Sequence, residues 1–184
     1  MGDNLFLDTV AKYDTDKAFY SSGYNEAFFS VREDIKLLFE IGVNRGGSVR
    51  MFKEYFPNAL IVGLEIDKKC YFEGEERISI EIGDATKKGF TECILAKYGK
   101  PDIVIDDGSH LSTDMKASFE LFYPHTKFSY VIEDLAEQVE GSHSVDDGIP
   151  ATTVIHHEIA KILSRSENTC KSIRVYPAIC FFMK

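Results

Sequence analysis

Residues 35–48, IKLLFEIGVNRGGS, decide the fold prediction for this 184-residue chain. The first eight are almost continuously apolar, as is typical of a strand buried on both faces of a parallel sheet. Glycines at positions 42, 46 and 47 let the backbone turn tightly and approach a ligand closely. Residues 48–56 then have helical spacing and are followed by Pro57. The stretch therefore predicts a strand, a glycine turn and a helix.

The same alternation continues along the chain. Further apolar runs are found at residues 59–66, 78–84, 102–107 and 128–134, with helical spacing at 88–98, 112–122 and 152–164. Strand–helix–strand repetition implies right-handed crossovers. Two final runs, 172–176 and 178–184, are separated by Pro177 alone, which is too short a connection for parallel strands. The predicted fold is α/β, a doubly wound, mostly parallel seven-stranded sheet with an antiparallel C-terminal strand pair.

The domain prediction is a single domain over residues 1–184, whose mass of 20.8 kDa is that of one ordinary domain. About the first 34 residues are expected to form an amphipathic helical arm. Polar residues 14–17 and the sequence Ser21-Ser22-Gly23 are expected to interrupt its helices.

Charge and composition limit the partners and the compartment. The net charge is −9, which argues against nucleic acid and against an anionic membrane surface. No apolar run approaches the roughly 18 residues of a membrane-spanning helix, and the first ten residues lack the features of a secretory signal. The four cysteines are scattered without a CxxC pair. We expect a cytoplasmic protein.

Ligands of open α/β sheets bind at the carboxyl ends of the strands. Glu65 ends the second predicted strand, about twenty residues after the glycine turn, where an acidic residue can accept hydrogen bonds from both ribose hydroxyls. Asp67 is the alternative to Glu65 for this contact with the ribose. Asp84, after the third predicted strand, is placed to accept a hydrogen bond from an adenine amino group. Because Asn44 breaks the GxGxxG pattern and no Lys follows Gly47, the sequence favours a nucleoside without a pyrophosphate.

The fourth and fifth predicted strands end in carboxylates. Asp106-Asp107-Gly108-Ser109-His110 follows one and Glu133-Asp134 the other. Carboxylates gathered at one sheet edge repel each other unless a cation is present, and hard oxygen ligands suit Mg²⁺. A histidine beside them is suited to general-base work. The alternative is structural: Asp107 and His110 in a turn, and a solvated Glu133-Asp134 pair.

Together, EIGVNRGGS, GLEI, GDA, IDDGSH and VIEDL resemble class I S-adenosylmethionine-dependent methyltransferases. More narrowly, they resemble the metal-dependent macrolide sugar O-methyltransferases of the macrocin and mycinamicin type and their cephalosporin-hydroxylase-like relatives. The early TDK followed by Gly23-Tyr24 is similar to the segment that precedes the cofactor fold in that group. The resemblance implies these roles: Glu40 and Gly42 on the methionine and ribose side of the cofactor, Glu65 at the ribose, Asp84 at the adenine, Asp106 beside the cofactor, Asp107, Glu133 and Asp134 on Mg²⁺, and His110 as the base.

The expected function is therefore S-adenosylmethionine-dependent, Mg²⁺-assisted O-methylation of a hydroxyl on a sugar or glycosylated small molecule. The alternatives are methylation of a catechol-like diol, a non-catalytic nucleoside-binding partner subunit, and a nicotinamide-dependent oxidoreductase. The acceptor is expected to be a small sugar or polyol. The segment 136–150, between the fifth predicted strand and the next helix, is short. Because the resemblance implies that this part shapes the acceptor pocket, the identity of the acceptor and a homo-oligomeric state stay open.

Overall fold

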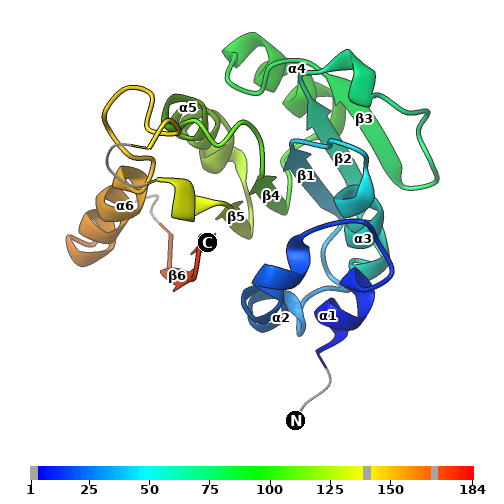
Figure 1. Cartoon of the computed structure of the whole chain (residues 1–184). Coiled ribbons are helices and arrows are strands. Elements are labelled where there is room, and N and C mark those ends of the chain that lie inside the picture. The colour runs from blue at the N-terminus through cyan, green and yellow to red at the C-terminus, as the bar shows by residue number, and fades with distance from the viewer. Residues whose placement is uncertain (1–3, 139–141, 167–169) are drawn as a thin grey trace.

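The computed structural model describes residues 4–138, 142–166 and 170–184. In these ranges seven strands form one sheet in the order β3-β2-β1-β4-β5-β7-β6 (Figure 1). The strands are β1 (Leu37–Ile41), β2 (Leu60–Glu65), β3 (Ile78–Ile82), β4 (Ile103–Asp106), β5 (Ser129–Ile132), β6 (Ser172–Tyr176) and β7 (Ile179–Met183). The first five are parallel, and β7 runs antiparallel to both β5 and β6. The predicted fold class is confirmed.

Helices cover both faces of the sheet (Figure 1). The α-helices are α1 (Leu5–Val10), α2 (Ser21–Phe28), α3 (Gly47–Tyr55), α4 (Lys88–Tyr98), α5 (Ser112–Phe122) and α6 (Thr153–Leu163). Short 3₁₀ turns are η1 (Lys17–Tyr20), η2 (Lys68–Cys70), η3 (Tyr123–His125) and η4 (Leu135–Glu137). None of the helices in the described part of the chain is long and apolar enough to cross a membrane.

The core has two layers because strand side chains alternate between the faces of the sheet. Leu38 of β1 packs with α1, α2 and α3, whereas its neighbour Phe39 packs with α4, α5 and α6. All five residues of β1 are buried, as the continuous apolar run predicts. Successive crossovers from β1 lead to β2 and β3, and the chain then returns to β4 on the other side of β1. The strand order thus reverses between β1 and β4, where Ile41 pairs with Asp106.

The N-terminal arm differs from its prediction at one point. The chain is non-helical at residues 14–16 as expected, but Ser21-Ser22-Gly23 begins α2 instead of interrupting it. Gly23 is required there by packing, since a Cβ atom on it would lie 2.9 Å from the ring of Phe181 in β7. Tyr24 is fully buried, and its ring lies 5.4 Å from that of Phe181. The arm is thereby packed against β7 of the sheet.

Candidate functional site

A cavity of about 720 Å³ opens at the carboxyl ends of the central strands, where the strand order reverses. Most of the residues predicted for the site line it: Gly42, Glu65, Asp84, Asp106, Asp107, His110 and Asp134. Glu40 and Glu133 do not line it and are completely buried. Residues 14–16 of the arm form part of the wall, which the sequence did not predict.

The glycine turn brings three parts of the chain into close approach. Gly42 has a φ of +88°, and a Cβ atom on it would lie 2.1 Å from the carbonyl oxygen of Asp107. A Cβ atom on Gly47 would lie 1.9 Å from the carbonyl oxygen of Asp14. Only glycine fits at either position. The two glycines thus let the turn pack directly against the backbone of Asp107 and Asp14.

Glu65 holds this turn in place. Its Oε2 accepts hydrogen bonds from the backbone N–H groups of Val43 and Asn44, at 2.9 and 3.1 Å, and Oε1 accepts from that of Asp67 at 2.9 Å. The carboxylate of Asp67 instead accepts from the backbone of Lys69, and Asp67 is not among the cavity residues. Of these two acidic residues, Glu65 lines the cavity and Asp67 does not, and the contact of Glu65 with a nucleoside stays a prediction.

Asp84 forms a tight turn with Thr86. Its Oδ1 accepts hydrogen bonds from the hydroxyl and the backbone N–H of Thr86, at 2.6 and 2.9 Å. These hydrogen bonds lower the pKa of Asp84 below its ordinary value. The side chain is therefore an ionised hydrogen-bond acceptor at the cavity wall.

Glu40 is an unpartnered carboxyl group behind the glycine turn. Burial raises its pKa to about 8, although the nearby Lys17 ammonium opposes the shift. Neither of its oxygens accepts a hydrogen bond from the residues that the structure describes. Buried carboxyl groups without donors are rare and costly. Glu40 lies beneath the glycine turn and not at the cavity surface, so its contact with a cofactor stays a prediction.

Asp106 is tied into the fold. It accepts hydrogen bonds from the Ser118 hydroxyl of α5 and, at 2.9 Å, from the Tyr130 hydroxyl of β5. Burial raises its pKa to about 6 in spite of these donors. The side chain thus fixes the end of β4 against its neighbours while one edge lines the cavity.

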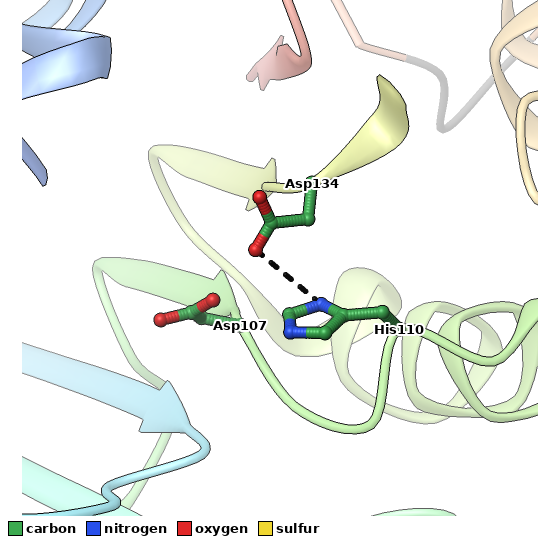
Figure 2. A group of neighbouring side chains, drawn as sticks. All are labelled: Asp107, His110 and Asp134. Carbon is green, nitrogen blue, oxygen red and sulfur yellow. Dashed lines mark ion pairs between the residues drawn. The ribbon is translucent and has the colours of Figure 1, made fainter. Parts of the chain in front are cut away.

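Asp107, His110 and Asp134 converge at the cavity, although they come from three different loop positions (Figure 2). One ligand atom from each lies within 4.8 Å of the others. His110 Nδ1 lies 3.5 Å from Asp134 Oδ2. His110 and Asp134 have φ values of 58° and 53°, in the left-handed region that Asp and His enter more readily than most residues. The two carboxylates are hard oxygen ligands suited to a cation such as Mg²⁺, and the imidazole lies beside them.

Glu133 lies outside this group of three. Its Oε2 accepts a hydrogen bond from the ammonium of Lys17 at 2.5 Å, and its Oε1 accepts one from the Tyr24 hydroxyl. Burial raises the pKa of Glu133, and the Lys17 ammonium opposes that shift. The carboxylate predicted as a metal ligand is therefore occupied by groups from the arm.

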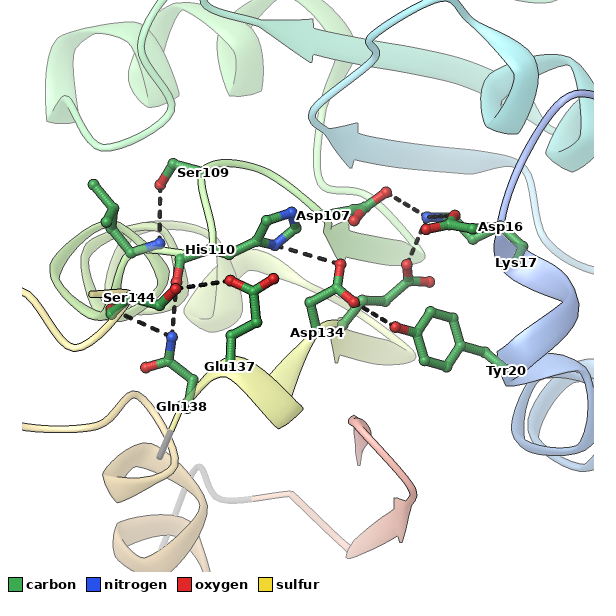
Figure 3. Close-up of polar contacts among 12 residues, drawn as sticks. Asp16, Lys17, Tyr20, Asp107, Ser109, His110, Asp134, Glu137, Gln138 and Ser144 are labelled. Carbon is green, nitrogen blue, oxygen red and sulfur yellow. Dashed lines mark hydrogen bonds and ion pairs between the residues drawn. The ribbon is translucent and has the colours of Figure 1, made fainter. Parts of the chain in front are cut away.

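Lys17 and Tyr20 are the site residues that the sequence analysis did not assign. Lys17 bridges Glu133 and Asp107, and Tyr20 donates a hydrogen bond to Asp134 Oδ1 at 2.6 Å (Figure 3). Burial alone would lower the pKa of Lys17, but Glu133 and Asp107 raise it well above its ordinary value. The signal in the sequence was the TDK segment, which carried only a resemblance and no role.

No protein-family model matches the chain. Curated relatives include the demethylmacrocin O-methyltransferase of Streptomyces fradiae and the mycinamicin VI 2''-O-methyltransferase of Micromonospora griseorubida. Each is 38% identical over 125 residues, which is 63% of this chain and 31% of the relative. The chain thus spans about a third of the length of the curated relatives that it matches.

Among solved structures, the MycE methyltransferase from the mycinamycin pathway, in complex with Mg, SAH and mycinamycin VI, has a TM-score of 0.86 to this chain. The identity is 28%, over 97% of this chain and 53% of that chain. The resemblance stated from the motifs is confirmed: the chain has the class I methyltransferase fold and is similar to the O-methyltransferases that act on macrolide sugars.

Proposed function

We propose that the chain is an S-adenosylmethionine-dependent, Mg²⁺-assisted O-methyltransferase that acts on a hydroxyl of a sugar or a glycosylated small molecule. The observation that carries the proposal is the convergence of Asp107, His110 and Asp134 on the cavity that also contains the glycine turn. The relatives named above, including the structure that holds Mg, SAH and mycinamycin VI, support the same reaction.

The proposed cofactor-binding residues are Glu40, Gly42, Glu65, Asp84 and Asp106, and the proposed metal ligands are Asp107, Glu133 and Asp134. When bound, S-adenosylmethionine supplies an electrophilic methyl group and Mg²⁺ supplies a Lewis acid that makes an acceptor hydroxyl more acidic. The backbone of the glycine turn and the carboxylate of Glu65 orient the nucleoside. The cavity wall brings the two reactants together, an effect that can contribute roughly 7–11 kcal/mol in well-oriented reactions.

His110 is the proposed general base. Its Nδ1 faces Asp134 Oδ2 at 3.5 Å, which leaves Nε2 to take the proton from the acceptor hydroxyl. The Asp134 carboxylate lies close enough to Nδ1 to stabilise the imidazolium that forms, although Nδ1 makes no hydrogen bond with the described residues. Tyr20 in turn fixes Asp134 through its other oxygen. The arm therefore supports the base through one intermediate side chain.

Calorimetric titration with S-adenosylhomocysteine and then with Mg²⁺ tests the proposal. Wild type should bind both, and Asp107→Asn should lose the metal signal while keeping the nucleoside. Asp114→Asn is the matched control, since Asp114 also lines the cavity but lies outside the group of three. Absence of nucleoside binding in the wild type would overturn the enzyme proposal. Nucleoside binding without a metal signal would remove Mg²⁺ from it.

The acceptor class needs its own experiment. Methyl transfer from S-adenosylmethionine should be measured with a glycosylated macrolide, with its aglycone and with a catechol. The proposal expects turnover of the glycosylated compound alone. Methylation of the catechol in its place would support a small-diol enzyme.

We further propose a cytoplasmic protein that acts without nucleic acid. Whether it self-associates into a homo-oligomer stays open. The support for the compartment is that no disulfide joins the four cysteines, all of which lie in the described ranges. The net charge of −9 opposes nucleic-acid binding. Fractionation of the source cells, a filter-binding assay with RNA and sedimentation equilibrium test the three statements in turn.

A further inference from the structure

Lys17 is a fully buried cation that comes from the arm and not from the sheet that carries the carboxylates. Its side chain is 1% exposed, and its ammonium contacts both Asp107 and Glu133. A buried charge is retained only when paired, and removal of one partner is strongly destabilising. The ammonium therefore compensates two carboxylates at the ends of β4 and β5, as Figure 3 shows for Asp107.

The contacts of Lys17 compete with the ligand set that the proposed function assigns to the metal. Both oxygens of Glu133 are bound by the arm, one by Lys17 and one by Tyr24. Asp107 accepts a hydrogen bond from the Lys17 ammonium through Oδ2, and its Oδ1 accepts none from the described residues. A divalent cation can reach Asp107 and Asp134 from the cavity, but it gains Glu133 only if Lys17 releases it.

We propose that Lys17 is a built-in counter-cation that competes with the divalent metal for Asp107 and Glu133. The inference rests on the metal-binding part of the proposed function. When the metal takes these carboxylates, Lys17 gives them up, and the ion pair that fastens the arm to the sheet is exchanged for metal coordination. Lys17 is thus a positioning residue that sets metal affinity and couples it to the arm.

The arm is placed to transmit this exchange to the cavity. Residues 14–16, directly before Lys17, line the cavity, and the Asp14 carbonyl oxygen packs against Gly47 of the cofactor turn. Tyr20, one turn after Lys17, holds Asp134. Movement of Lys17 would therefore affect both the cofactor turn and the orientation of the proposed base.

The test is Mg²⁺ affinity and thermal stability in Lys17→Met. Loss of the ammonium removes a repulsive charge from the metal site, so Mg²⁺ should bind about tenfold more tightly, or more, by calorimetry. In the presence of chelator the Tm should fall by about 5 °C or more, because two carboxylates lose their counter-charge. Saturating Mg²⁺ should restore most of that loss.

Two control variants isolate the charge. Lys17→Arg keeps the cation and should bind Mg²⁺ within about threefold of wild type. Lys12→Met removes a lysine of the same arm whose partner, Glu54, lies away from the cavity, and should leave Mg²⁺ affinity unchanged. A purely structural role for Lys17 would lower both stability and metal affinity, and that result would overturn the proposal, as would unchanged affinity.

A measurement on the wild type covers the case in which Lys17→Met does not fold. The ¹⁵N signal of the buried Lys17 ammonium should change on addition of Mg²⁺, whereas that of Lys12 should not. An unchanged Lys17 signal in a protein that binds Mg²⁺ would show that Lys17 keeps its carboxylates, and would overturn this inference alone. Failure of the wild type to bind Mg²⁺ would instead remove the metal-binding part of the proposed function, and the inference with it.

Discussion

The two halves of the site are built in different ways. The cofactor half, which contains Gly42, Glu65 and Asp84, is held by contacts between consecutive strand–turn units: Glu65 binds backbone 21 and 22 residues away, and Asp84 binds Thr86. The carboxylate half consists of Lys17, Asp107, His110, Glu133 and Asp134. Its ion pairs join residues 90 and 116 positions apart. The hydrogen bonds of the first half span at most 22 residues, whereas the ion pairs of Lys17 in the second half require the docked arm.

Substitution of the base should give the largest effect and should be confined to the carboxylate half. His110→Gln is expected to lower kcat by about 10³-fold, within the range for loss of a general base. Affinity for S-adenosylhomocysteine should stay within about twofold of wild type, because the cofactor half is untouched. His125→Gln, in η3, is the control and should keep full activity. An equal loss of cofactor affinity in His110→Gln would show that the halves are not separable.

Gly42→Ala should distort the backbone of the glycine turn and so disrupt the cofactor half of the site. The added Cβ atom meets the Asp107 carbonyl oxygen, and the φ of +88° is unfavourable for any residue with a Cβ atom. We expect a loss of about 3 kcal/mol in the free energy of unfolding, measured with urea, and no detectable cofactor binding. Gly89→Ala is the matched control: nothing lies within 4 Å of its Cβ position on α4, so it should be neutral or slightly stabilising. Near-native stability of Gly42→Ala would contradict the packing argument.

Substitutions of Glu65 and Asp67, the two candidate acidic residues at the end of β2, should differ clearly in their effect on cofactor affinity. Glu65→Gln places an amide where three backbone N–H groups donate, so cofactor affinity should fall by about 10- to 100-fold. Asp67→Asn should change it by less than about twofold, since Asp67 only caps η2. Calorimetry with S-adenosylhomocysteine measures both. The reverse order would move the ribose contact to Asp67.

The smallest effect concerns Glu40, between the two halves. Burial raises its pKa to about 8 from an ordinary value near 4.5, so the folded protein loses stability from this group as the pH rises from about 5 to 8. Glu40→Gln stays neutral and escapes that loss. The variant should be close to wild type in stability at pH 5 and more stable than wild type at pH 8, in urea unfolding. A difference between Glu40→Gln and wild type that stays constant over this pH range would contradict the burial effect.

Much of the fold and half of the site could be predicted from the sequence. Continuous apolar runs determine strands buried on both faces, as in β1, and the single proline between the last two runs excludes a parallel pair. Glycine at position 42 and an acid at the end of β2 are likewise properties of short, contiguous stretches. The predicted interruption of the helix at Ser21-Ser22-Gly23 was wrong. We interpreted Gly23 as a turn signal, but the position needs a glycine because the ring of Phe181 packs against it.

Only the tertiary structure determined which groups contact each carboxylate of the site. The sequence grouped Glu133 with Asp107 and Asp134, but the fold encloses it with Lys17 and Tyr24 and brings His110 to the other two. Strands and turns follow from the conformational preferences of neighbouring residues. The partner of a buried charge depends instead on which distant segment fills the space beside it, and here the docked arm provides that segment.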